Sequence, residues 1–145
     1  MKFAKSAKLA FGAMIIAGAF AQTAAFAQSV AVTSIVEHPA LDSIKDGVKD
    51  ALKAAGYTEA KGLKWQFQTA QGNTAIAAQI ARKFVGDNPD VIVAIATPSA
   101  QAVVAATKKI PVVYSAVTDP VAAQLVPSMA PSGTNVTGIS DGLGV

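Results

Sequence analysis

The chain has 145 residues, with twelve Lys and Arg, nine Asp and Glu, one His and no Cys. The lack of cysteine excludes a disulfide framework, a thiol nucleophile and the lipid-modified cysteine that tethers some exported proteins to a membrane. Three of the basic residues lie in the first eight positions and no acidic residue lies before position 37, so the rest of the chain is neutral and lacks the charge of a nucleic-acid-binding protein.

The first 27 residues have the pattern of a secretory signal peptide. Three lysines come first, positions 9–21 are uncharged and largely apolar, and Ala25 and Ala27 fit the small-residue positions of a cleavage site. About 13 apolar residues are too few for a transmembrane helix, which needs roughly 20. We therefore expect cleavage before Gln28 and export to the periplasm. The mature chain would be soluble, without stable membrane insertion, and its 118 residues are enough for one domain.

Short apolar runs then alternate with segments of helical periodicity. This order predicts an α/β fold, with a parallel sheet and helices on both faces. The run 91–96 is uniformly apolar and suits a central strand, whereas 63–69 alternates and suits an edge strand. Strands are expected at 29–36, 63–69, 91–96, 111–117 and 135–140. Helices are expected from Pro39 to a glycine cap at Gly56, from Asn73 to Val85, from Pro98 to Thr107 and from Asp119 to Leu125.

Three of the four expected strand-to-helix turns place a proline at the first helical position, after His38, Thr97 and Asp119. In a parallel sheet these turns lie at one edge, where open α/β folds bind ligands. Free N–H groups at Ser99 and Ala100 suit a carboxylate or a phosphate. Thr97 and Asp119 are also natural helix caps. The turns and their hydroxyl side chains predict a polar rim that includes Thr97, Ser99, Ser115 and Thr118.

The single histidine, His38, follows Glu37 and leaves an exported α/β enzyme open as an alternative, with His38 acting beside a nearby carboxylate. The sequence lacks H-E-x-x-H, G-x-S-x-G, G-x-G-x-x-G and the P-loop motif. We therefore expect a protein that is not an enzyme, with no catalytic residue, no metal site and no cofactor.

Four blocks of the sequence resemble the substrate-binding proteins of ABC transporters, in the tryptophan/tyrosine-type branch. The blocks are IVEHPALDSIKDGVKDALKAAGY, ATPSAQAV, VYSAVTDPVAAQLV and GTNVTGIS. They follow the family's order from Ser29 to about Asp141 and include the three turns. The resemblance implies a type I periplasmic binding protein of two α/β lobes, the first of them Rossmann-like, which closes on an amino-acid-like or other small organic solute and delivers it to a membrane permease.

The resemblance also implies where the first lobe contacts its solute. The family pattern places these contacts after the first, third and fourth strands, at Glu37, His38, Thr97, Ser99, Ser115, Thr118 and Asp119. From the same resemblance we expect residues 28–141 to form the first lobe, residues 142–145 to be an aberrant or truncated tail, and the second lobe to be absent from this sequence. A truncated chain of this kind also leaves open a remnant that has no activity of its own.

Overall fold

The computed structural model describes residues 28–131 and 133–142, so the predicted signal peptide and the last three residues lie outside it. Five strands and three α-helices follow the expected order. The strands are β1 (Ser29–Ser34), β2 (Lys64–Thr69), β3 (Val91–Ile95), β4 (Val112–Val117) and β5 (Val136–Ser140). The helices are α1 (Pro39–Ala54), α2 (Thr74–Asp87) and α3 (Thr97–Ala106), with a short 3-10 helix at Glu59–Lys61.

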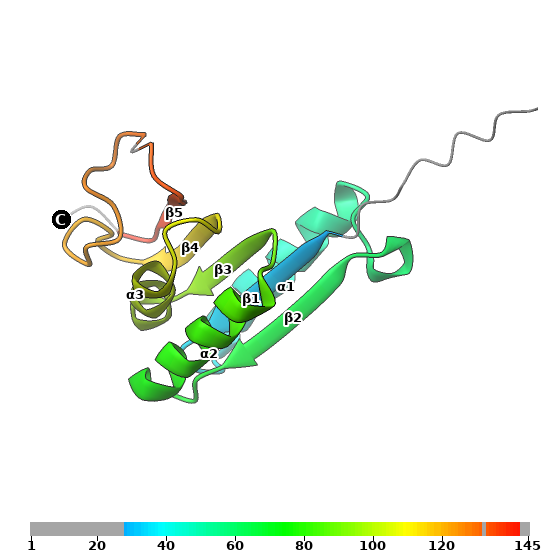
Figure 1. Cartoon of the computed structure of the whole chain (residues 1–145), viewed down its shortest axis with the longest axis horizontal. Helices are drawn as coiled ribbons and strands as arrows, with labels where there is room; N and C mark the ends of the chain where they lie inside the picture. The colour runs from blue at the N-terminus through cyan, green and yellow to red at the C-terminus, as the bar shows by residue number, and fades with distance from the viewer. Residues whose placement is uncertain (1–27, 132, 143–145) are drawn as a thin grey trace, which may run out of the picture.

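The five strands form one sheet in the order β2-β1-β3-β4-β5, and all four strand pairs are parallel. The apolar strand β3 is central and the alternating strand β2 lies at an edge, as the sequence predicts. Figure 1 shows α2 and α3 on the near face of the sheet and α1 on the far face. The α/β prediction, with helices on both faces of a parallel sheet, is confirmed.

Two apolar cores hold the layers together. On the face of α1, Val32 and Ile95 are fully buried beneath partly buried Ile44 and Val48 of that helix. On the other face, Phe84 of α2 and Val103 of α3 are fully buried in a larger cluster. Fully burying a side chain of this size contributes roughly 1.5–3 kcal/mol, so these contacts fix the helices against the sheet and hold the strand ends in place.

The residues that cap the helices mark where each helix starts or ends. The side chain of Asn73 caps α2 by accepting hydrogen bonds from the N–H groups of Ala75 (2.8 Å) and Ile76 (3.2 Å). Gly56 follows the end of α1 with φ at 90°, a left-handed conformation that favours glycine. The glycine cap predicted at Gly56 is confirmed, and Asn73, the expected start of the second helix, is its cap.

The expected helix from Asp119 to Leu125 is wrong. This segment makes a single turn, in which the N–H of Ala123 bonds to the carbonyl of Asp119 at 2.9 Å. Gln124 then adopts φ 59°, which ends the right-handed turn, and Pro127 follows three residues later. Within residues 28–131 and 133–142, no helix has the length and apolar character needed to cross a membrane.

Candidate functional site

The direction of the chain changes between β1 and β3. From β1 the chain passes through α1 to β2 on one side, and α2 then brings it back to β3 on the other side of β1. The carboxyl ends of β1 and β3 are adjacent, with Ser34 in register with Ile95. A crevice at such a switch point is the usual ligand site of open α/β sheets. Glu37 and His38 follow β1 there, and the turn that begins α3 follows β3.

One backbone and one side-chain hydrogen bond join the next turns to this edge. The N–H of Ala96, just after β3, donates to the carbonyl of Ser115 in β4 at 2.9 Å. The hydroxyl of Ser140, at the end of β5, donates to the carbonyl of Thr118 at 2.8 Å. The predicted residues after the third and fourth strands therefore belong to one continuous edge.

The start of α3 differs from the sequence-based prediction. Ala96 is the N-cap residue and makes no side-chain capping bond, so Thr97 is the first helical residue and not the cap. The amide of Ala100 donates to the carbonyl of Ala96 at 3.0 Å, so it is not available to a ligand. Ser99 is 0% exposed, and its Oγ has no hydrogen-bond partner. A buried unpaired hydroxyl is costly and needs an explanation.

Two of the predicted site residues cap chain segments through their side chains. His38 Nδ1 accepts a hydrogen bond from the N–H of Ala40 at 3.2 Å and caps α1. Asp119 Oδ1 accepts from the N–H groups of Val121 (3.1 Å) and Ala122 (2.9 Å). Both side chains are exposed at the sheet edge. The capping prediction for Asp119 is therefore confirmed, although the segment that it caps is one turn.

Strained backbone lies along the same edge, and the sequence gives no sign of it. Ala96 has φ 74° and ψ 152°, a backbone conformation that residues other than glycine rarely adopt. Ala116 has φ 53°, within an irregularity in the β4–β5 pairing between Tyr114 and Val117. Strain of this kind costs about 1–3 kcal/mol per residue and is concentrated at functional sites.

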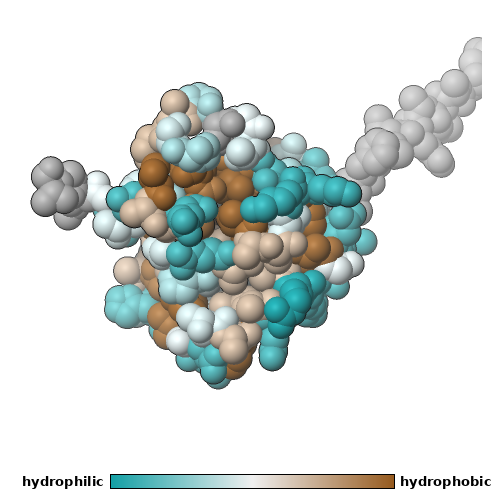
Figure 2. Space-filling view, turned by 60° about the vertical axis from the view of Figure 1, so that its left-hand side comes forward, coloured by the Kyte–Doolittle hydropathy of each residue, from teal (hydrophilic) through white to brown (hydrophobic). Residues whose placement is uncertain are grey.

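The predicted rim is open and not a closed cavity. Glu37, His38, Thr118 and Asp119 are exposed, and a cavity along the described part of the chain includes Ser115. Figure 2 turns the end of the molecule that carries β4 and β5 toward the viewer, and hydrophobic surface lies open there among hydrophilic groups.

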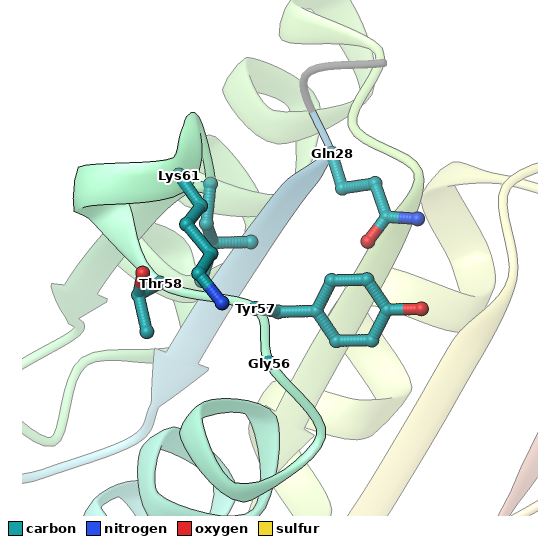
Figure 3. Close-up of a pocket in the computed structure, with 6 residues that line it drawn as sticks. Gln28, Gly56, Tyr57, Thr58 and Lys61 are labelled. Atoms are coloured by element: carbon teal, nitrogen blue, oxygen red, sulfur yellow. The ribbon is translucent and has the colours of Figure 1, made fainter. Parts of the chain in front are cut away.

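A separate cavity of about 270 Å³ lies near the amino ends of the strands. Figure 3 shows the Tyr57 ring and the Gln28 side chain extending side by side, with the amine of Lys61 directed toward the chain at Tyr57 and Thr58. Because the switch point is at the carboxyl ends, this cavity is at the opposite edge of the sheet. Among the described residues, no group of three or more His, Asp or Glu side chains is placed to hold a metal ion.

Comparison with known proteins identifies the family. The family model for the ABC transporter substrate binding protein matches residues 29–145. The chain belongs to this family. A curated relative, a tyrosine-binding protein of Clostridioides difficile (strain R20291), is 47% identical over 116 residues, which are 80% of this chain and 34% of the relative.

Solved structures of the family share the fold. A conserved domain protein from Vibrio cholerae O1 biovar El Tor has 61% identity and a TM-score of 0.79, over 80% of this chain and 39% of that one. A substrate binding protein with adhesive properties from Clostridium difficile, in its ligand-free open form, has 45% identity and a TM-score of 0.79, over 81% and 40%. A Streptococcus pneumonia ABC domain in complex with L-Trp has 38% identity and a TM-score of 0.76, over 79% and 39%. The chain thus spans well under half the length of these relatives.

Proposed function

We propose that this chain is a solute-binding lobe of a periplasmic ABC transporter protein, which takes a small amino-acid-like solute at the carboxyl edge of its sheet and passes it to a membrane permease. The observation that carries the proposal is the match of residues 29–145 to the family of ABC transporter substrate binding proteins, on a fold in which α3 begins at the carboxyl edge without a side-chain cap. The positive end of a helix dipole suits a carboxylate. The hydroxyl of Ser99 at this helix start is buried and has no protein partner, so it would contact the solute only when the start of α3 shifts.

The relatives favour an aromatic amino acid as the solute. One relative is named for tyrosine and another was solved with L-Trp. The carboxylate of either amino acid matches the start of α3. Because this chain covers about two fifths of those structures, the opposite wall of the cleft would come from the part of the longer protein that follows this lobe.

The proposal gives no catalytic role to His38. Its Nδ1 is already used to cap α1, and the family is one of binding proteins. An exported enzyme that uses His38 with a nearby carboxylate has no observation in its favour. Glu37, His38, Thr97, Ser115, Thr118 and Asp119 are proposed solute contacts, together with Ser99, and the capping bonds of His38 and Asp119 hold those two side chains at the rim.

Calorimetry on a completed two-lobe protein tests the proposal. The full chain would be fused to the part of the Vibrio cholerae relative that lies beyond the matched region, and titrated with L-tyrosine, L-tryptophan and a panel of other amino acids. We expect saturable binding of at least one amino acid. A correctly folded fusion that binds none of them would overturn the proposal.

Variants of the fusion then locate the solute. Ser99→Ala removes the unpaired hydroxyl and should weaken binding about tenfold, as expected for one lost hydrogen bond to a charged or strongly polar group. Asp119→Ala should also weaken binding if its carboxylate contacts the solute, and an unchanged dissociation constant would show that it is only a cap. Thr58→Ala is the matched control, because Thr58 lines the cavity near the amino ends of the strands, at the opposite edge of the sheet.

A further inference from the structure

The pairing of β3 with β4 ends in one hydrogen bond that has a residue of positive φ on each side of it. The N–H of Ala96, the residue after β3, donates to the carbonyl of Ser115 at 2.9 Å. Ala96 has φ 74°, and Ala116, which follows Ser115 directly, has φ 53°. Alanine rarely adopts a positive φ, because its Cβ then crowds the backbone carbonyl oxygen. Two such residues joined through one hydrogen bond are therefore held in place by the structure around them.

The positive φ of Ala116 belongs to an extra residue in β4. Between its last two pairings with β5, β4 advances by three residues and β5 by two. The pairs are Tyr114 with Gly138 and Val117 with Ser140. Side chains of a regular strand alternate between its two faces, yet Tyr114 and Val117 lie in the same apolar core. β4 therefore contains a β-bulge, which reverses the alternation just before the strand reaches the solute rim.

Ala96 sets the direction in which α3 leaves the sheet. Its carbonyl accepts a hydrogen bond from the N–H of Ala100 in the first turn of the helix at 3.0 Å, while its own N–H is bonded to β4. Both polar groups of its backbone are thus in use, so Ala96 cannot reorient without breaking one of these bonds. Thr97, the first helical residue, follows directly. The place of Thr97 at the rim therefore depends on the backbone of Ala96.

We propose that Ala96 and Ala116 are positioning residues of the solute site, which act through their shared hydrogen bond at Ser115 and hold the turns after β3 and β4 in one arrangement. Their role rests on the proposed function, since the side chains that they place are proposed solute contacts. Bulges and strained residues are concentrated beside binding sites, where they redirect side chains. A turn that is already ordered also spares the solute the cost of ordering it. The contacts placed in this way are Thr97 on one turn, and Thr118 and Asp119 on the other.

Glycine at either position separates this role from a purely structural one. Glycine adopts positive φ without strain, so Ala96→Gly and Ala116→Gly should leave the folding equilibrium constant of the two-lobe fusion unchanged or raise it. The same substitutions loosen the turns, so a solute must order them when it binds. We expect each variant to bind the tightest-binding amino acid of the calorimetric panel, which includes L-tyrosine and L-tryptophan, about three- to tenfold more weakly than the unmodified fusion does.

Asn88→Gly is the matched control. Asn88 also has a positive φ, of 49°, but it caps the end of α2 and lies just before β3, at the edge of the sheet opposite to the solute rim. This change should leave the dissociation constant unchanged. Undiminished binding by both alanine-to-glycine variants would overturn the proposal, and so would an equal loss of affinity in Asn88→Gly.

Hydrogen exchange of the Ala96 amide tests the shared bond without any solute. In the folded full chain, Ala116→Gly should speed the exchange of this amide at least about threefold, measured by NMR, because the Ser115 carbonyl that accepts it is held less firmly. Asn88→Gly should leave the rate unchanged. The same exchange rate in Ala116→Gly and in the original chain would overturn the coupling of the two residues. A fusion that binds no amino acid would instead overturn the proposed function, and the exchange rates would still decide whether Ala96 and Ala116 are coupled.

Discussion

Ser29 donates two hydrogen bonds to the carboxylate of Asp90, from its backbone N–H at 2.7 Å and from its hydroxyl at 2.9 Å. Asp90 in turn donates its own N–H to the Ser29 hydroxyl at 3.0 Å. These bonds fasten the first strand to the start of β3. The backbone N–H of Ser29, and then its hydroxyl, hold the pKa of Asp90 below its ordinary value of 3.8.

Asp90→Asn should therefore lower the free energy of unfolding at neutral pH, because a neutral amide accepts weaker hydrogen bonds than a carboxylate. The pKa of Asp90 is lower in the folded state than in the unfolded state. The advantage of the original chain is thus present above the unfolded pKa and is lost as the pH falls through the folded value. Urea titrations from neutral pH down to about pH 2 should show the two proteins converging.

Asp50→Asn, on the exposed side of α1, is the control for this series and should have little effect at any pH. A destabilisation by Asp90→Asn that stays constant down to the lowest pH would show that the charge of Asp90 is not its source.

Gly138 in β5 is the glycine that tolerates a side chain least. A Cβ atom there would lie 2.5 Å from the ring Cγ of Tyr114 and closer still to the Tyr114 carbonyl oxygen, which belongs to the backbone and cannot move aside cheaply. We expect Gly138→Ala to destabilise the chain by about 1–3 kcal/mol, measured by thermal or chemical unfolding.

Gly47→Ala is the matched comparison. A Cβ at Gly47, within α1, meets nothing within 4 Å, and alanine is the better helix former. This change should stabilise the chain by about 0.5–1 kcal/mol. If both substitutions had the same sign, the close approach of β5 to Tyr114 would be in error.

Ala96 carries the most strained backbone of the predicted rim, and Ala96→Gly should relieve it. The gain is about 1–3 kcal/mol of removed strain, reduced by the roughly 1 kcal/mol that glycine costs through the unfolded state. We expect a small net stabilisation in urea unfolding. Ala78→Gly, in the middle of α2, should instead destabilise by about 1 kcal/mol.

Among the residues that the structure describes, two buried hydroxyls have no hydrogen-bond partner, those of Thr33 and Ser99. Ser99→Ala and Thr33→Val replace them with apolar groups, and without solute each should leave the free energy of unfolding unchanged or raise it by up to about 1–3 kcal/mol. A marked loss of stability in either variant, measured by chemical unfolding, would mean that its hydroxyl has a partner in the ligand-free protein.

Much of this fold can be predicted from the sequence because its local signals agree with the final structure. The runs 29–34 and 91–95 are apolar on both faces, as strands covered by helices must be, and Asn73 and Gly56 mark the ends of helices. The segment after Asp119 begins with a good signal for the start of a helix, but the structure forms only a single turn there. An Asp-Pro pair shows where a turn begins, and it says nothing about how far a helix continues.

The edge of the sheet that carries the candidate site could be predicted from the sequence, and the details of that edge less so. Parallel strands bring their carboxyl ends to one edge whatever the side chains are, so Thr97, Ser115 and Asp119 were placed correctly at that edge. Which hydroxyl is buried depends on how α3 rotates against the sheet, and that rotation is set by tertiary packing. Alanine carries no signal for the left-handed region, so the strained position of Ala96 was invisible in the sequence.

The position of β1 in the sheet affects the order in which the chain assembles. β1 is made first, yet its two neighbours arrive much later: Ser29 pairs with Lys64, and Val30 pairs with Val91. The entropy of closing each loop must be spent before the corresponding pairing is formed, which slows folding in chains of this topology. A chain that emerges from its N-terminus would therefore leave β1 unpaired until β2 had followed it, and paired on one side only until β3 arrived.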